Sequence, residues 1–269
     1  MQRQSGFSIM KRLILELKPL IFVMLITITM GVLGFLAAIA IASFAAVALG
    51  TIVEGPTIVT FQAAIIIMVV CAVSRGLLRY AEQLSGHYIA FKILYLLRDK
   101  IFTKLRTLAP AKLEGKDKGN LISLITSDIE LLEVFYAHTI APIAIALLTN
   151  SMIAIILYFI HPAYGFVAAA YFILVGVIVP YVSSILVKTA GVNYRQAFAS
   201  SNQYILDSLR GLKEILLFNQ GQERLAALNE QSNQLNKSVR KIKDHEGFVT
   251  GLTGVIITSA MLVFVGMDN

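Results

Sequence analysis

The sequence predicts an all-α membrane protein, because composition, pattern and charge placement agree. Hydrophobic residues occupy 57% of the 269 positions and charged residues only 14%, and the mean hydropathy is +0.75. These values do not suit a water-soluble surface. Five apolar runs are long enough to cross a hydrocarbon core about 30 Å thick, which needs roughly 20 helical residues. The basic residues are confined to three segments of the chain.

The apolar runs are separated either by short turns or by long charged segments. Glu54–Pro56 divides the first run from the second, and His161–Pro162 divides the third from the fourth, since proline and glycine end helices. Pro142 and Pro180 are expected to loosen the third and fourth helices. Backbone groups in lipid must be satisfied within a segment, so each run is predicted to be helical. The predicted crossings are residues 20–52, 57–80, 138–160, 163–187 and 248–267.

The placement of the basic residues predicts the orientation in the cell membrane. Of the 23 lysines and arginines, four precede residue 20, ten lie from Arg75 to Lys118 and nine from Lys188 to Lys243. Basic residues near membrane helices stay on the cytoplasmic side, so the segment 1–19 and both long loops are expected there. The same rule explains the net charge of +7, because anionic membrane lipid is the expected partner of the basic residues. Nucleic acid is not expected as a partner.

Both long loops keep a helical pattern beyond the length that a bilayer needs. Apolar residues recur every three or four positions from Arg75 to Leu108, so the second crossing is predicted to continue as a helix outside the membrane. The segment 188–247 repeats this plan, with one apolar stripe from Tyr194 to Leu216 and a break at Asn219–Gly221. We therefore expect two helical hairpins with polar elbows at their tips, whose apolar faces need partner helices.

Two sequence runs resemble a known family. Residues 119–128 are similar to the G-D/E-L-x-S-x-L-x-x-D pattern after the first elbow in the transmembrane domain of ATP-binding-cassette (ABC) exporters, with Asn120 in place of the usual acid. Residues 206–215, with Phe218, look like the second elbow of the same family. The stretch 79–110 resembles most closely the subfamily linked to cysteine and glutathione export in cytochrome bd assembly. The resemblance covers residues 20–267.

This resemblance implies a fold and a function. The fold is the ABC exporter type-1 transmembrane bundle with long cytoplasmic helical extensions, in a domain over 20–269 that holds five of the usual six crossings. The implied function is export of a substrate, such as cysteine or glutathione, by alternating access. The implied partners are a nucleotide-binding domain and a second transporter half, as a homodimer or heterodimer. The implied coupling residues at the elbows are Lys116, Gly119, Asn120, Asp128, Asp207, Gly211, Lys213 and Glu214.

The sequence lacks the phosphate-binding loop that an ATPase of this family needs. No G-x-x-x-x-G-K-[ST] pattern occurs, and Gly115-Lys116 has Pro110 where the first glycine should stand. We therefore expect no enzyme activity and no cofactor in this chain, with ATP and Mg²⁺ bound by a partner domain. An alternative hypothesis is a non-transporting membrane scaffold or regulatory partner built on the same fold.

Few polar residues within the crossings are candidates for a site. The four histidines show no i, i+4 pair and no nearby cysteine, so no metal site is predicted. His138 lies at the inner edge of the third crossing, where an ionisable residue can face a water-filled cavity. Asn150 lies near the middle of that crossing and either bonds a neighbouring helix or lines a pathway. The absence of charged residues from the middle of the crossings argues against a proton- or sodium-coupled carrier.

Overall fold

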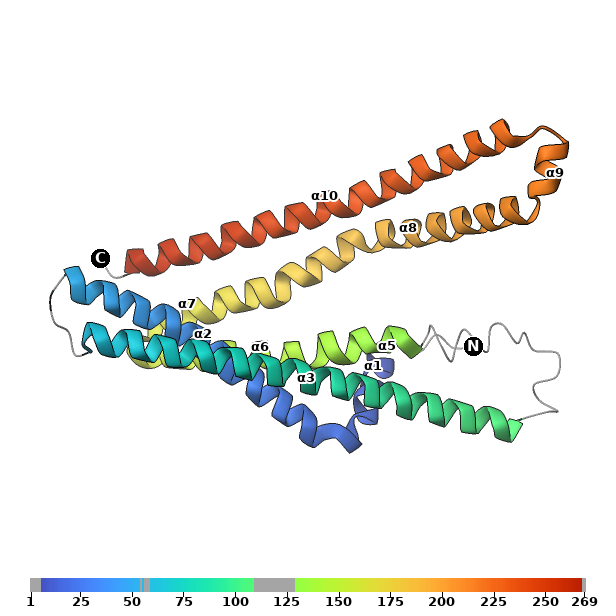
Figure 1. Cartoon of the computed structure of the whole chain (residues 1–269). Helices are drawn as coiled ribbons and strands as arrows, with labels where there is room; N and C mark the ends of the chain where they lie inside the picture. The colour runs from blue at the N-terminus through green and yellow to red at the C-terminus, as the bar shows by residue number, and fades with distance from the viewer. Residues whose placement is uncertain (1–5, 54, 56–58, 109–128, 268–269) are drawn as a thin grey trace. The chain divides into compact units, whose positions relative to one another are not determined.

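The computed structural model describes residues 6–53, 55, 59–108 and 129–267. All regular structure in these ranges is helical, so the predicted all-α class is confirmed (Figure 1). The chain divides into two compact units, residues 1–152 (unit 1) and 153–269 (unit 2), with the boundary inside α6 (Ala141–Ile160). Each unit is described by itself.

Each unit is a succession of helical elements. Unit 1 contains, in order, α1 (Gly6–Glu16), a 3-10 turn (Lys18–Leu20), α2 (Ile21–Val53), α3 (Phe61–Leu108), α5 (Ile129–Phe135), the π-helical stretch η3 (Tyr136–Ile140) and the first part of α6. Unit 2 contains the end of α6, then α7 (Pro162–Ile173), the π-helical stretch η4 (Leu174–Ile178), α8 (Val179–Arg210), α9 (Leu212–Leu217) and α10 (Gly221–Met267).

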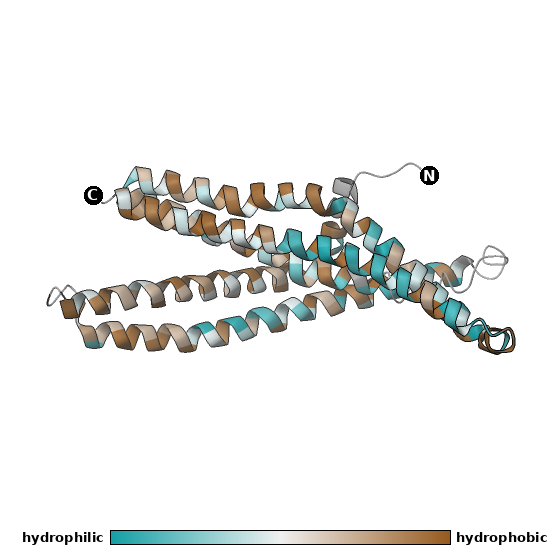
Figure 2. Cartoon of the chain, turned by 90° about the horizontal axis from the view of Figure 1, so that it is seen from above, coloured by the Kyte–Doolittle hydropathy of each residue, from teal (hydrophilic) through white to brown (hydrophobic). Residues whose placement is uncertain are grey.

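Five helical stretches in the described part of the chain are long and apolar enough to span a membrane. Several exceed that need: α3 has 48 residues and α10 has 47, so each is about 70 Å long at 1.5 Å per residue, more than twice the hydrocarbon thickness. Figure 2 shows hydrophilic residues gathered on one part of the longest helices and apolar residues on the rest. The candidate spans are Lys18–Val53, Phe61–Thr107, Leu132–Ile160, Pro162–Arg210 and Gly221–Met267.

The core of unit 1 joins the N-terminal segment to α3 and α6. The Tyr136 side chain is 1% exposed, and its hydroxyl donates a hydrogen bond to the Leu13 carbonyl oxygen at 2.9 Å. Around it pack Leu17, Leu20, Met24, Ile89, Ala90, Ile93 and Ala141. Two ion pairs at the edge, Lys100 with Glu16 and Arg98 with Glu130, are solvent-exposed. Exposed pairs contribute at most about 1 kcal/mol, so apolar packing holds this segment.

Close helix contacts in both units depend on glycine. A side chain at Gly31 in α2 would overlap the Ile145 side chain of α6. A Cβ at Gly165 in α7 would lie 2.7 Å from Cα and 2.9 Å from N of Tyr158, near the end of α6. Membrane helices lack a hydrophobic driving force for association in lipid, and small residues let their backbones approach closely.

Pro142 and Pro180, which were expected to loosen their helices, each lie two residues after the end of a π-helical stretch. Pro142 follows η3, and Pro180 follows η4. Proline has no N–H for the i−4 carbonyl and its ring clashes with that carbonyl, so the wider π turn makes room for it. The sequence led us to expect that Pro142 and Pro180 loosen the third and fourth helices, and the structure has a π-helical stretch just before each of them.

Two further helix boundaries differ from the sequence prediction. The second crossing was expected to begin at residue 57, but α3 begins at Phe61, where the Thr60 hydroxyl accepts a hydrogen bond from the Ala63 N–H at 3.3 Å and so acts as the N-cap. The apolar stripe Tyr194–Leu216 was expected to lie on one helix, but α8 ends at Arg210 because the chain turns at Gly211. The predicted break at Asn219 is confirmed.

In unit 2, α10 packs antiparallel along α8 and α7 in a constant register. From the tip of the hairpin, Arg224 lies over the Tyr204 ring at 4.7 Å, and the Ser183 hydroxyl and His245 Nε2 are 3.0 Å apart. Further along, the Tyr171 hydroxyl lies 3.2 Å from Ser259 Oγ, and the rings of Tyr164 and Phe264 meet edge to face. The paired residues recede along one helix as they advance along the other. This hairpin therefore has polar or aromatic contacts over most of its length.

Replacing Gly165 by alanine should destabilise the α6–α7 turn, because its Cβ would lie within 3 Å of Tyr158 backbone atoms. Overpacking of this kind costs about 1–3 kcal/mol. The matched control is Gly251→Ala in α10, where a Cβ meets nothing within 4 Å. Thermal unfolding in detergent should show a lower midpoint for G165A and an unchanged or higher midpoint for G251A. Equal midpoints would contradict the close approach.

Candidate functional site

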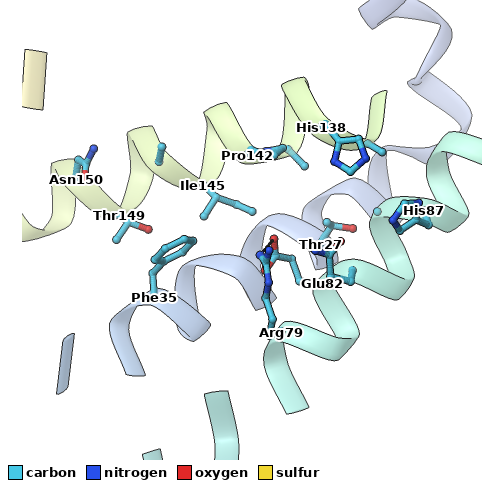
Figure 3. A pocket seen from close by; sticks show the side chains of 15 residues that line it. Thr27, Phe35, Arg79, Glu82, His87, His138, Pro142, Ile145, Thr149 and Asn150 are labelled. Carbon is cyan, nitrogen blue, oxygen red and sulfur yellow. Dashed lines mark hydrogen bonds and ion pairs between the residues drawn. The ribbon is translucent and has the colours of Figure 1, made fainter. Parts of the chain in front are cut away.

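Unit 1 encloses a cavity of about 310 Å³ between α2, α3 and the η3–α6 segment (Figure 3). This volume lies at the low end of the roughly 300–1,000 Å³ range of small-molecule pockets. Apolar side chains supply part of the wall and polar ones the rest. The labelled lining residues are Thr27, Phe35, Arg79, Glu82, His87, His138, Pro142, Ile145, Thr149 and Asn150.

The strongest charges at the cavity come from Arg79 and Glu82, one helical turn apart on α3. Arg79 Nη1 lies 2.7 Å from both carboxylate oxygens of Glu82. The side chain of Glu82 is only 12% exposed, whereas that of Arg79 is 55% exposed. Burying a charged group costs free energy unless it is paired, and Arg79 supplies that pairing. The pair therefore places two opposite charges side by side at the cavity wall.

The two histidines lie at one end of the cavity in Figure 3. The rings of His87 and His138 meet edge to face with centroids 5.6 Å apart, and His87 stacks on Phe91 at 6.0 Å. His87 Nδ1 is 3.9 Å from Glu133 Oε1, which is too long for a hydrogen bond. Within the described ranges, no group of three or more His, Cys, Asp or Glu side chains is placed to hold a metal ion.

Thr149, at the other end of the cavity, has a buried hydroxyl without a hydrogen-bond partner in the described part of the chain. Its residue is 6% exposed. Threonine in a helix ordinarily donates to the i−4 carbonyl, as Thr27 does to Val23 at 2.9 Å and Thr29 to Leu25 at 2.8 Å. An unsatisfied buried hydroxyl costs about 1–3 kcal/mol. The Thr149 hydroxyl is therefore an unpaired, buried donor on a residue of the cavity wall.

The structure places two of the predicted residues, His138 and Asn150, in the wall of this cavity. Sequence reasoning did not select the charged residues of α3. The signal for them is their spacing, because Arg79, Glu82, Gln83, Gly86 and His87 recur at intervals of three and four residues. That period puts them on one face of a helix. This polar face lies just beyond the uncharged run of residues 57–74, so it places no charge in the middle of a crossing.

A second candidate site is the elbow at the tip of the unit 2 hairpin. The Gly211 N–H donates to the Asp207 carbonyl at 2.9 Å and ends α8. After the six residues of α9, the Gln220 N–H donates to the Ile215 carbonyl at 3.0 Å, and the Asn219 N–H points to the Leu216 carbonyl at 3.3 Å. With Asn219 at φ 52°, these two bonds form a Schellman motif that closes α9.

The elbow carries apolar side chains on its outer surface. Ile215 is 9% exposed and anchors α9, whereas Leu216, Leu217 and Phe218 are 70–74% exposed. These three adjacent residues form an exposed apolar surface at the tip of the hairpin. Of the predicted coupling residues, Asp207, Gly211, Lys213 and Glu214 lie at this elbow. The others, Lys116, Gly119, Asn120 and Asp128, lie outside the described residues.

Five helical stretches of membrane-spanning length and composition in the described part of the chain indicate a multi-pass membrane protein, and its unit 1 contains a partly polar cavity. A family model described as ABC transporter transmembrane region matches residues 20–267, and the chain belongs to this family. The resemblance inferred from the elbow sequences is thereby confirmed.

Known relatives of the chain are ABC permease proteins. It is 43% identical over 267 residues to a probable ABC transporter ATP-binding/permease protein of Haemophilus influenzae, which covers 98% of this chain and 48% of the relative. It is 29% identical over 148 residues to the glutathione/L-cysteine transport system ATP-binding/permease protein CydC of the same organism, and 27% identical over 147 residues to CydC of Escherichia coli; each match covers 55% of this chain and 26% of the relative. The chain thus spans about half the length of the first relative and aligns with about a quarter of CydC.

Replacing Asn219 by valine should loosen the end of α9, because a β-branched residue is strained at φ 52°. The left-handed conformation costs an ordinary residue about 1–2 kcal/mol, so hydrogen exchange at the Gln220 amide should accelerate roughly tenfold or more. Asn219→Gly, which tolerates this φ, is the matched control and should keep the protection. Equal exchange in the two variants would show that the Schellman motif does not hold the elbow.

Proposed function

We propose that this chain is the membrane part of an ATP-driven exporter, which moves a small thiol such as cysteine or glutathione out of the cytoplasm. The observation that carries the proposal is the short helix α9 with its exposed Leu216, Leu217 and Phe218, on a chain of the ABC transmembrane family. ATP and Mg²⁺ bind to a nucleotide-binding domain that covers this elbow. A second transporter half completes the bundle.

The proposed orientation places the N-terminus and both hairpin tips in the cytoplasm, with the chain in the cell membrane. The support is the distribution of all 23 basic residues over three segments that the positive-inside rule assigns to one side. In this orientation the α9 elbow and ATP are on the same side of the membrane. Mechanical coupling between the two requires that arrangement.

The proposed mechanism is alternating access. Closure of the nucleotide-binding domains moves the elbow, and α8 and α10 move with it because contacts such as Arg224 with Tyr204 and Ser183 with His245 join them along their length. The bundle then shifts between an inward-facing and an outward-facing state, each favoured by a different nucleotide state. ATP hydrolysis returns the bundle to the first state.

The proposed substrate class rests on two observations. Relatives at 27–29% identity are named as glutathione/L-cysteine transport proteins. In addition, the unit 1 cavity of about 310 Å³ has a size that suits an amino acid or a short peptide and is partly polar. A cavity of that size does not accommodate a folded polypeptide.

Two substitutions at the elbow should reduce ATP-dependent export without reducing membrane insertion. Phe218→Ala removes an apolar side chain that would contact the nucleotide-binding domain, and Glu214→Lys reverses a charge at the same surface. Truncation of a residue that anchors an interface costs about 2 kcal/mol, which is equivalent to more than tenfold in affinity. The matched control is Glu230→Lys on α10, an exposed carboxylate that bonds Gln234 on its own helix. Export of labelled cysteine and glutathione is measured in vesicles that contain the chain and its nucleotide-binding partner.

We expect export to fall about tenfold or more in F218A and E214K and to stay near wild type in E230K. Normal export in both elbow variants would contradict the coupling role of α9. A stable complex with the nucleotide-binding partner, in which neither thiol is exported and neither alters ATP hydrolysis, would favour the non-transporting scaffold instead.

A further inference from the structure

The adjacent charges of Arg79 and Glu82 give the unit 1 cavity a specific chemistry. We propose that the cavity binds the zwitterionic head group of an α-amino acid, with the α-carboxylate on Arg79 and the α-ammonium on Glu82. An α-amino acid carries its two opposite charges on groups attached to one carbon, and the cavity presents two opposite charges in contact. This inference names the class of substrate that the cavity binds. It rests on the proposed function only in treating that ligand as the transported molecule.

Arg79 retains the donors that a carboxylate needs. Its contact with Glu82 uses Nη1 alone in the described part of the chain. A guanidinium has five N–H donors in a planar fork, so Nη2 and Nε can face a second carboxylate. More than half of the side chain is exposed, and Figure 3 shows it rising from α3 to the cavity.

Glu82 has the complementary capacity. An ionised carboxylate offers about four lone-pair sites, and the two contacts with Arg79 Nη1 engage one on each oxygen. A ligand ammonium, with three donors, can take the sites that remain. Since the Glu82 side chain is only 12% exposed, this contact would be desolvated and therefore strong.

The far end of the cavity provides a place for the ligand's side chain. The buried Thr149 hydroxyl, which lacks a partner among the described residues, and the Asn150 amide lie there, and Phe35 and Ile145 form apolar walls between them and the charged pair (Figure 3). A ligand side chain with an apolar stem and a polar end fits this order of apolar and then polar groups along the cavity. Cysteine and glutathione share the required head group, because the γ-glutamyl end of glutathione has a free α-amino acid group.

The charge balance of the cavity favours a zwitterion over an anion. Among its lining residues in the described part of the chain, Arg79 is the one Arg or Lys and Glu82 the one Asp or Glu, so this wall presents one group of each sign. Arg75 lines the adjoining hollow beside the same pair. A simple anion would gain from Arg79 and be repelled by Glu82, and a simple cation would have the opposite difficulty. A zwitterion satisfies both groups at once. The simpler interpretation is that the pair is a local i, i+3 salt bridge with no ligand, and the experiment separates the two.

The test measures binding of four thiols to the full chain in lipid nanodiscs, by equilibrium dialysis under reducing conditions. L-Cysteine carries both charges, 3-mercaptopropionate only the carboxylate, cysteamine only the ammonium, and 2-mercaptoethanol neither. We expect L-cysteine to bind at least about tenfold more tightly than each singly charged thiol, since each charge-assisted hydrogen bond contributes at least about that factor. Equal affinities for all four would overturn the proposal, with no variant needed.

Variants then assign each charge to a residue. Arg79→Gln should remove the advantage of L-cysteine over cysteamine, and Glu82→Gln should remove its advantage over 3-mercaptopropionate. Thr149→Val removes the unpartnered hydroxyl and should weaken L-cysteine binding several-fold. The matched controls are Arg106→Gln near the end of α3 and Thr29→Val, whose hydroxyl already bonds Leu25; both should bind as wild type. A purely structural salt bridge would predict that R79Q and E82Q lower all affinities alike.

The outcome is independent of the proposed transport function. If L-cysteine binds with the expected pattern but is not exported when the nucleotide-binding partner is present, the site stands and the exporter proposal fails. If export continues in R79Q and E82Q with unchanged selectivity, the site proposal fails and the exporter proposal stands.

Discussion

The absence of water in the bilayer is the constraint on which the rest of this structure depends. Each backbone N–H and C=O within the spans must bond inside its own helix, so the chain has only helices in its described part. The same constraint applies to side chains. The hydroxyls of Thr27 and Thr29 donate hydrogen bonds to backbone carbonyls one helical turn earlier. Thr149 is an exception to this pattern, and it lies at the cavity.

Packing in this chain is selective because lipid supplies no hydrophobic drive between helices. Large side chains such as Phe22 and Phe159 are 73% and 83% exposed, which suits surfaces that face lipid or another subunit. Tight contact occurs where glycine allows it, as between Gly31 and Ile145. The two prolines lie where a π-helical stretch interrupts the regular bonding, and η3 with Pro142 forms part of the cavity wall. A helix with a wide turn beside a cavity has a place where its hydrogen bonding can change, and π-bulges are frequent at functional sites.

The sequence predicted the helices well and the site in part, for physical reasons. Apolar runs determine which segments enter lipid, so five long helices and the break at Asn219 could be predicted from hydropathy and turn chemistry. The end of α8 at Gly211 could not be predicted, because the apolar stripe continues past this residue. Only the structure shows that the chain turns there. His138 and Asn150 attract notice as polar residues in an apolar run. Arg79 and Glu82 lie beside such a run, and only the fold shows that they line a cavity together with residues of α2 and α6.

The central claim is that one cavity opens to opposite sides of the membrane in turn, and thiol labelling tests it most directly. Cys71 is the only cysteine, so Cys71→Ser gives a background in which Ala146→Cys, on the exposed cavity-facing side of α6, is the single thiol. A membrane-impermeant maleimide is applied to either face of vesicles, with the nucleotide-binding partner present. The account predicts labelling from the cytoplasmic face without nucleotide and from the outer face after trapping with ATP and vanadate. Labelling from the same face in both conditions would contradict it.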